Sequence, residues 1–420
     1  MKIFKFGGAS SSSADGIRNV ANIIKERIDY QLLVIISAMG KTTNALEALL
    51  KAIRNGEDFM PYYNKVKVYH LEIMHDLFPE NHPVFSEAEA LFFMMMTTSK
   101  YKDEDYDFHY DQLVSIGEML SSKIVAAYLN FIGVDAKWLD VRKCISTDSN
   151  FREGNVNWVK TARQINEVID CEDNSKKCIV TQGFLGGDEK GRSITLGREG
   201  SDYTGAIFAH CLEADSLTIW KDVPGFLNAD PRYFSETTKI PQIAYSEAIE
   251  LAYYGADIIH PKTIKPLQNK NIPLLVKSFK DPNSEGTVIH TEGGKNKNVT
   301  FYICKPNQVL FTIYPKDFSF IAEQNLSYIF FVFAENNMKI NLMQNSALSF
   351  TVCVNNNSQR INDVIEQLSN KFDVRHNSDL QLITLRHFKE SDIKNLTKNL
   401  DILLEQRTRV TAQLVVKGFC

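Results

Sequence analysis

With 420 residues, the chain is too long for one typical hydrophobic core, so we expect two or more domains. Its 44% hydrophobic and 23% charged residues are typical of a globular protein, and a formal net charge of -4 without a basic cluster argues against a nucleic-acid-binding protein. The seven scattered cysteines indicate reduced thiols in a cytoplasmic protein, and apolar runs such as residues 90–96 are too short to cross a membrane.

In the first two thirds of the chain, short apolar runs alternate with amphipathic helical patterns. Strands are predicted at residues 3–6, 32–37, 178–184, 216–220 and 273–279. Apolar strands separated by helices predict an α/β domain with a mostly parallel central sheet covered by helices on both faces, and we assign it residues 1 to 280. Ligands of such sheets bind beyond the carboxyl ends of the strands.

The last third follows a different pattern. A polar linker is predicted at residues 281–300, and a β-α-β-β-α-β order follows from about 305 to 378. This order is typical of a ferredoxin-like α+β module. A second, shortened module is predicted at about 379–420, with a helix near residues 391–405 and a strand at 410–416.

Residues 195–206 (TLGREGSDYTGA) are the most informative segment of the sequence. A glycine-rich turn that opens a helix leaves backbone N–H groups unpaired, which favours an anion. Arg198 adds a planar donor suited to a carboxylate or phosphate, and Asp202 adds a negative group in the first turn. The alternative is an ordinary capped helix with a surface ion pair.

A lysine and two glycines mark the end of the first predicted strand. Lys5 lies within the strand, where an ammonium group needs a partner such as phosphate, and Gly7 and Gly8 permit close backbone approach. The alternative is a surface lysine on an edge strand. Residues 38–43 (AMGKTT) resemble the end of a P-loop, but Ile35 stands where that motif needs glycine, so we reject it.

Two further segments carry candidate residues. Glu118 is placed at the start of a helical pattern, where it could bind a ligand or simply favour the helix dipole. Residues 220–232 form a long loop after a strand, and it contains Lys221, Asp222 and Arg232. A nucleotide would bind at such a position.

Taken in order, KFGGAS, SAMGKTTN, SIGE, VTQGF, TLGREGSDYT, WKDVPG with DPR, and YYGADIIHPKT resemble aspartate kinases of the amino acid kinase superfamily. These segments occur in the family's order and cover roughly residues 1–279, the predicted α/β domain. The C-terminal modules resemble the paired ACT domains that bind regulatory amino acids in that family. The ordered set is far more specific than any one segment.

The resemblance implies ATP-dependent phosphorylation of the L-aspartate β-carboxylate to 4-phospho-L-aspartate, the first step of lysine, threonine and methionine biosynthesis. Lys5 and Asp202 would be catalytic. The residues implied to bind aspartate are Thr43, Glu118, Arg198 and Ser201. The residues implied to bind ATP are Lys5, Gly7, Gly8, Lys221, Asp222 and Arg232. Mg²⁺ would be held mainly by ATP phosphates and water, so no protein ligand for it is implied.

The resemblance also implies feedback regulation and a homodimer formed through the ACT-like modules, with no nucleic-acid or membrane partner. Asn341 and Ser346 match the region that binds an effector, which would be lysine or threonine. Asn341 stands where an aspartate is common.

Two departures from the family pattern concern the nucleotide. Asp257 stands where a lysine commonly faces the phosphates, so Lys221 or Lys262 would have to replace that cation. Leu227 stands where a tyrosine often packs on the base. They motivate an alternative, a catalytically weakened amino-acid sensor of the same fold. Other amino acid kinases and carbamate kinases lack the ACT-like modules and the combined motifs.

Overall fold

The computed structural model describes residues 1–28, 31–170, 178–256, 258–294, 299–317 and 319–419. The chain divides into two compact units that are not contiguous in sequence. The first contains residues 1–226, 241–249 and 258–294, and the second contains residues 227–240, 250–257 and 295–420.

The central sheet of the first unit is mostly parallel, as predicted. Its strands are β1 (Lys2–Phe6), β2 (Leu32–Ile36), β3 (Ala136–Leu139), β4 (Cys178–Gln182), β7 (Ser216–Lys221), β10 (Gln242–Ala244), β11 (Leu274–Ser278) and β12 (Thr287–His290). Among the described residues the order is β10-β12-β11-β7-β1-β2-β4-β3, and the β11–β12 pair is antiparallel. Strand β1 is central in the sheet, since it pairs in parallel with both β2 and β7.

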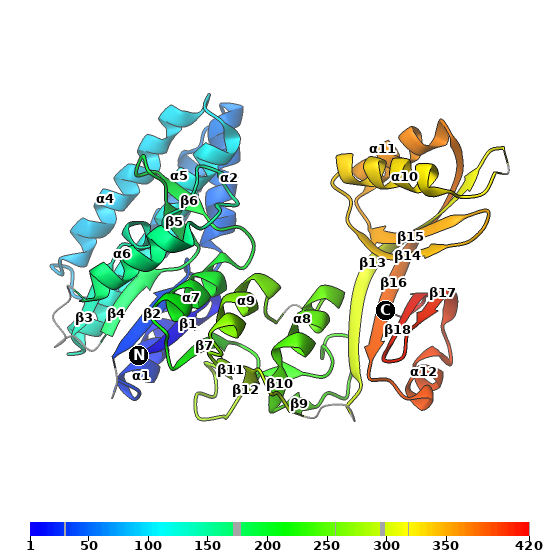
Figure 1. The fold of residues 1–420 in the computed structure, drawn as a ribbon. Helices are drawn as coiled ribbons and strands as arrows, with labels where there is room; N and C mark the ends of the chain where they lie inside the picture. The colour runs from blue at the N-terminus through cyan, green and yellow to red at the C-terminus, as the bar shows by residue number, and fades with distance from the viewer. Residues whose placement is uncertain (29–30, 171–177, 257, 295–298, 318, 420) are drawn as a thin grey trace. The chain divides into compact units, whose positions relative to one another are not determined.

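Helices cover this sheet (Figure 1). They are α1 (Ala14–Lys25), α2 (Thr42–Asn55), α3 (Met60–Leu77), α4 (Val84–Thr97), α5 (Tyr106–Phe131), α6 (Trp158–Asp170), α7 (Gly200–Cys211) and α9 (Pro261–Asn269). Helix α8 (Tyr245–Tyr254) and two short hairpins, β5 (Leu185–Gly187) with β6 (Ser193–Thr195) and β8 (Phe226–Leu227) with β9 (Lys239–Ile240), complete the elements before the second sheet.

The side chains of β1 alternate between two faces of the sheet. Phe4 and Phe6 join the core formed with α1 to α5. On the other face α7 packs closely, since a Cβ added to Gly205 would lie 2.9 Å from Leu217 of β7. Lys5 therefore lies on the α7 face of β1, because successive strand residues point to opposite faces.

The second unit contains one antiparallel sheet. Its elements are β13 (Phe301–Pro315), α10 (Glu323–Glu335), β14 (Ile340–Asn345), β15 (Phe350–Asn355), α11 (Ser358–Ser369), β16 (Phe372–Arg386), α12 (Glu390–Thr397), β17 (Asp401–Arg407) and β18 (Thr411–Lys417). Among the described residues the order is β14-β15-β13-β16-β18-β17. Figure 1 shows α10 and α11 beside each other against one part of this sheet.

Strands β13 and β16 each serve both ACT-like modules. Residues 308–313 of β13 pair with β15, whereas residues 301–305 pair with the part of β16 that also pairs with β18. The register shifts between these two parts of β13. The second module thus has a strand that lies before the first module in the sequence, which a linear comparison of the two repeats does not detect.

The prediction of a helix at residues 391–405 is wrong for the second half of that range. Helix α12 ends at Thr397, and residues 401–407 form β17, which pairs with β18. The apolar residues fit a helical period, but Leu403 and Leu404 pack against the second sheet instead. Tertiary strand pairing therefore outweighs the local periodicity.

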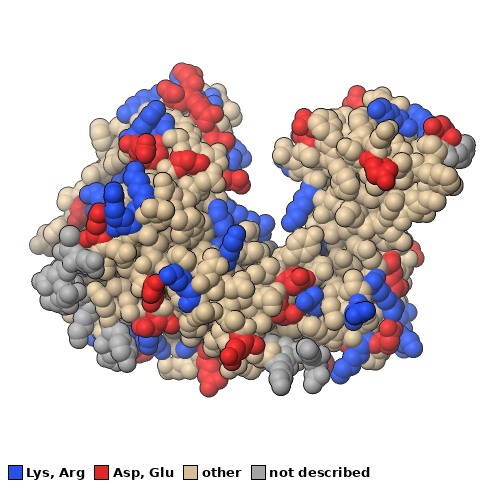
Figure 2. Space-filling view, viewed as in Figure 1, with Lys and Arg blue, Asp and Glu red and all other residues tan. Residues whose placement is uncertain are grey.

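The surface charges and the cysteines are distributed as the composition predicts. Figure 2 shows acidic and basic side chains interspersed over the visible face of each unit. Cys144, Cys178, Cys304 and Cys353 are buried free thiols. Among the described helices, none has the length and hydropathy needed to span a bilayer.

The aromatic cluster at the centre of the first sheet provides a stability test. Trp220 is fully buried, stacks on Phe6 with ring centroids 5.7 Å apart, and meets Phe4 edge-on at 5.6 Å. We expect Trp220→Ala to lower the free energy of unfolding by about 3–5 kcal/mol. The partly exposed Trp158 is the control, and Trp158→Ala should lose about 1 kcal/mol. Denaturant unfolding followed by circular dichroism measures both, and equal losses would contradict this role of Trp220.

Candidate active site

Lys5 occupies a central, buried position in the sheet. It lies beside Ile35 of β2 and Ile219 of β7, and its side chain is only 10% exposed. The edge-strand alternative for this lysine is therefore excluded. A buried ammonium group requires a charged or polar partner.

The partner of Lys5 is Asp202, in the first turn of α7. The Nζ atom of Lys5 lies 2.6 Å from Oδ1 of Asp202, and Nζ of Lys221 lies 3.6 Å from Oδ2. Lys221 also donates to the carbonyl of Ile258. Complete burial would raise the pKa of Asp202, but the two ammonium groups outweigh this effect and hold it below its ordinary value. The cluster is thus an ionised carboxylate between two cations.

The backbone around this cluster is tightly packed. A Cβ added to Gly8 would lie 2.5 Å from the carbonyl oxygen of Ala38 and 2.9 Å from that of Gly40. The Gly40 N–H donates to the Gly8 carbonyl at 2.9 Å, so the segments after β1 and β2 are joined directly. A Cβ on Gly7 would lie 3.6 Å from Nζ of Lys5. Glycine at these positions leaves the backbone accessible to a ligand close to the lysine.

Glu118 approaches the same strand ends from the opposite face of the sheet. It lies in the middle of α5 rather than at a helix start, so a role at the helix N-terminus is excluded. Its Oε2 accepts the Ala38 N–H at 2.9 Å. Burial raises the pKa of Glu118 to about 8, although this hydrogen bond and the charge of Lys5 oppose the shift.

The turn before α7 has an unusual backbone. Glu199, the residue that precedes the helix, has φ 55° and ψ 27° in the left-handed region, which costs a non-glycine residue about 1–2 kcal/mol. A Cβ on Gly200 would lie 2.4 Å from the Phe184 ring, and one on Gly183 would lie 2.5 Å from Cβ of Ser201. The turn is thus packed closely against the segment after β4, while Arg198 is exposed at its tip.

Sequence reasoning missed Asp111, a fully buried carboxylate of α5 that supports this turn. Its Oδ2 accepts the backbone N–H groups of Thr195 at 2.9 Å and Arg152 at 3.0 Å, and its Oδ1 accepts the Thr195 hydroxyl at 2.7 Å. Burial raises the pKa of Asp111 to about 6 despite these bonds. An acidic residue two positions before an apolar run inside a helix was the available signal, but its partners are distant in sequence.

Other predicted residues of the first unit lie near strand ends or helix starts. Thr43 is half-buried in the first turn of α2, and Asp222 is exposed directly after β7. Lys262 donates to the carbonyl of Leu196 at 3.0 Å. Asp257 lies outside the described residues.

The remaining predicted residues belong to the second unit. Arg232 is exposed and forms a bidentate ion pair with Asp230, and Leu227 is half-buried in β8. Ser346 is exposed after β14, and its N–H donates to the carbonyl of Ser349 at 2.9 Å.

Asn341 is hydrogen-bonded within the second sheet. Its amide nitrogen donates to Gln308 and to Asn355, each at 2.8 Å, and its oxygen accepts from Lys305 at 3.1 Å. Gln308 is buried where the register of β13 shifts. An effector would have to replace these bonds or use the backbone of β14.

No cluster of three or more His, Cys, Asp or Glu side chains suited to a metal ion occurs among the described residues. The site instead combines closely spaced lysine side chains, the accessible backbone of glycines and a buried carboxylate, all at the carboxyl ends of parallel strands. This arrangement defines a site for anionic ligands in a doubly covered α/β sheet.

Comparison with known proteins agrees with an α/β protein that binds anionic ligands. Residues 1–278 match the family model of the amino acid kinase family. The chain is 31% identical to lysine-sensitive aspartokinase 3 of Escherichia coli over 83% of its length and 76% of that protein. It is 29% identical to chloroplastic aspartokinase 1 of Arabidopsis thaliana over 87% of its length and 65% of that protein.

Solved structures show the same relationship. Escherichia coli aspartokinase III in complex with lysine and aspartate superposes with a TM-score of 0.84 at 27% identity, covering 100% of this chain and 96% of that one. The structure of the same enzyme with aspartate and ADP gives a TM-score of 0.82 at 27% identity, with the same coverage. The chain therefore belongs to the amino acid kinase family and, within it, to the aspartokinases.

The raised pKa of Glu118 predicts how stability depends on pH. The folded protein holds this proton up to about pH 8, whereas the unfolded chain releases it near 4.5, so the stabilisation is complete at low pH and lost as pH rises through 8. Glu118→Gln should therefore raise the free energy of unfolding at pH 9 by about 3–5 kcal/mol relative to the parent and change it little at pH 4. Urea unfolding at both pH values checks this, and an equal effect at both would contradict it.

Proposed function

We propose that this protein catalyses the ATP-dependent phosphorylation of the L-aspartate β-carboxylate, giving ADP and 4-phospho-L-aspartate. The observation that carries the proposal is the Lys5–Asp202–Lys221 cluster around a fully buried carboxylate, with Glu118 bonded to the backbone just after β2. The aspartokinase relatives support the choice of substrates. The reaction opens the biosynthesis of lysine, threonine and methionine.

The reaction requires charge neutralisation more than proton transfer. An oxygen of the β-carboxylate attacks the γ-phosphorus, one P–O bond forms, and the P–O bond to the ADP oxygen breaks. The nucleophile is already an anion, so no general base is needed. The obstacle is repulsion between this carboxylate and the triphosphate, and Lys5 with the amides near Gly7 and Gly8 offsets it at the transferring phosphate.

Asp202 keeps this arrangement in place. Its carboxylate holds the ammonium groups of Lys5 and Lys221 side by side, where mutual repulsion would otherwise separate them. Lys221, Asp222 and Arg232 bind ATP, and Lys221 supplies the cation that a lysine at position 257 would provide. Mg²⁺ would be held by the ATP phosphates and water and would neutralise part of their charge.

The remaining residues bind aspartate. Arg198 pairs with the α-carboxylate, Glu118 pairs with the amino group, and Thr43 and Ser201 donate hydrogen bonds. Glu118 releases its proton to solvent when the substrate ammonium binds, because an adjacent positive charge stabilises the carboxylate that burial disfavours.

The first test is turnover in a coupled assay of aspartate-dependent ADP formation with Mg²⁺. We expect Lys5→Ala and Asp202→Ala each to lower kcat by about a thousandfold or more, since each disrupts the cations of the transition state. Lys2→Ala, on the same strand, is the control and should retain activity. No turnover by the parent, with aspartate still bound in calorimetry, would identify an amino-acid sensor instead.

Arg198 has a separate expected effect. Arg198→Ala should raise KM for aspartate by about 10- to 100-fold and leave KM for ATP nearly unchanged, because it removes one charge-assisted interaction with aspartate alone. Initial rates with either substrate varied measure the two constants. Parallel changes in both would show that the turn around Arg198 acts on the nucleotide as well.

We also infer regulation by lysine or threonine and homodimer formation through the second unit, with Asn341 and Ser346 near the effector. Strand β14 is at the edge of the sheet, and Phe330, Phe331, Met343 and Leu348 are exposed large apolar side chains of the same module. A free strand edge with apolar neighbours favours pairing with a second copy.

Mass measurement by light scattering tests the dimer. Met343→Asp, on β14, should shift the protein towards monomer, because it places a charge on the apolar interface. Phe93→Asp is the control, since Phe93 is 61% exposed on α4 of the first unit and should not change the mass. A monomeric parent protein, or equal effects of both changes, would contradict the proposed interface.

A further inference from the structure

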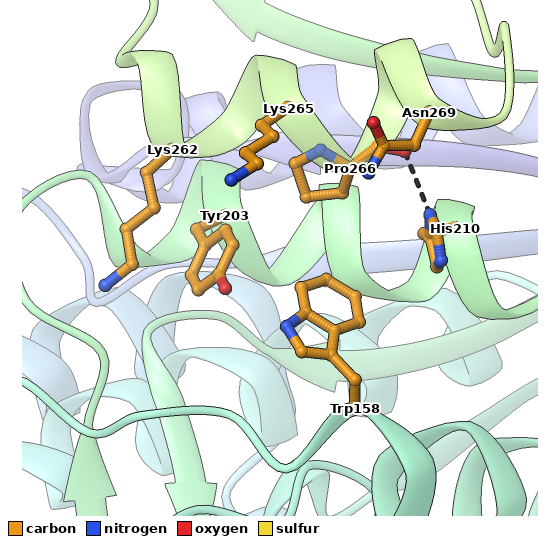
Figure 3. A pocket seen from close by; sticks show the side chains of 7 residues that line it. All are labelled: Trp158, Tyr203, His210, Lys262, Lys265, Pro266 and Asn269. Atoms are coloured by element: carbon orange, nitrogen blue, oxygen red, sulfur yellow. Dashed lines mark hydrogen bonds between the residues drawn. The ribbon is translucent and has the colours of Figure 1, made fainter.

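A groove between α6, α7 and α9 lies outside the cluster around Asp202. It has a volume of about 370 Å³, within the range of small-molecule sites. Its lining residues are Trp158, Tyr203, His210, Lys262, Lys265, Pro266 and Asn269. Figure 3 shows the α9 residues on one side, Trp158 of α6 opposite them, and Tyr203 and His210 of α7 between.

Helical spacing explains why these side chains share one surface. Tyr203 and His210 are seven residues apart, two turns along α7, and Lys262, Lys265 and Asn269 follow at intervals of three and four on α9. Pro266 lies within α9, and its carbonyl accepts a hydrogen bond from Nδ1 of His210 at 2.9 Å. This bond assigns the proton to Nδ1 and fixes the imidazole against the helix end.

Trp158 provides an aromatic wall of this groove. It meets His210 edge-on with ring centroids 5.1 Å apart and Tyr203 at 6.4 Å, so its position is fixed by two rings. Even so, 36% of the residue is exposed. An ordered indole with exposed surface is suited to pack against a further planar ring.

The opposite wall is positively charged. Lys265 is exposed and forms no hydrogen bond or ion pair with any residue that the structure describes. Nζ of Lys262 lies 4.8 Å from the centroid of Tyr203 and donates to Leu196, which leaves two of its three N–H donors for another acceptor. None of the described residues that line the groove is acidic. The charge of the lining therefore favours an anion.

We propose that this groove binds a planar aromatic anion, with its ring against Trp158 and its negative group on Lys265 and Lys262. The aromatic wall and the two lysines are on opposite sides, so a ligand needs a ring and a charge at separate ends. Aliphatic anions and neutral aromatic molecules each satisfy only half of the site.

The probe for this site is 2-naphthoate, titrated into the full chain by isothermal calorimetry. We expect one equivalent to bind with a Kd of about 0.1–1 mM, and the neutral 2-naphthalenemethanol to bind about fivefold or more weakly. Lys265→Ala should weaken naphthoate binding by about fivefold and Trp158→Ala by about tenfold. No heat of binding up to the solubility limit, or equal binding of the alcohol, would overturn the proposal.

A matched variant separates a local contact from a general charge effect. Lys270 follows directly after α9, is exposed and pairs with Glu213, and does not line the groove. Lys270→Ala removes the same charge as Lys265→Ala and should leave the affinity unchanged. Equal losses in the two variants would overturn the proposal, as would displacement of naphthoate by saturating ADP, which would assign the probe to a nucleotide site.

Discussion

The ion pair between Lys5 and Asp202 is the interaction on which the candidate site depends. Neither group tolerates burial alone, because an isolated charge in the interior loses several kcal/mol of hydration energy. Their contact at 2.6 Å, with the partly exposed Lys221 near the other carboxylate oxygen, makes the burial of Lys5 and Asp202 possible. The pair also connects β1 to α7, the helix that covers it. The geometry of the site therefore depends on how α7 packs on the sheet.

In the proposed reaction, this ion pair provides charge neutralisation, and no general base is needed. A carboxylate nucleophile has no proton to lose, and the two lysines are already positioned before any substrate arrives, so little reorganisation is required. Glu118 and Asp111 are buried acids with raised pKa values, but they differ in role. Glu118 reaches the strand ends, whereas Asp111 holds the strand that leads into the Arg198 turn.

The second unit depends on a different constraint, the shared strands β13 and β16. Each contributes one part to either ACT-like module, so the modules cannot separate without breaking the centre of the sheet. The polar cluster of Lys305, Gln308, Asn341 and Asn355 lies where the register shifts. Binding at β14 would therefore act on the junction of both modules rather than on one alone.

The sequence by itself determined the fold class, the central strands and the residues at their ends. Strands of a parallel sheet are buried on both faces, so they require continuous apolar runs that are easily recognised in the sequence. It also determined that Lys5 needs an anionic partner. Only the tertiary structure decided that Asp202 is this partner, that Glu118 lies in mid-helix, that Asp111 supports the Arg198 turn and that residues 401–407 form a strand. These outcomes rest on contacts between segments distant in sequence, and local periodicity carries no information about which segments meet.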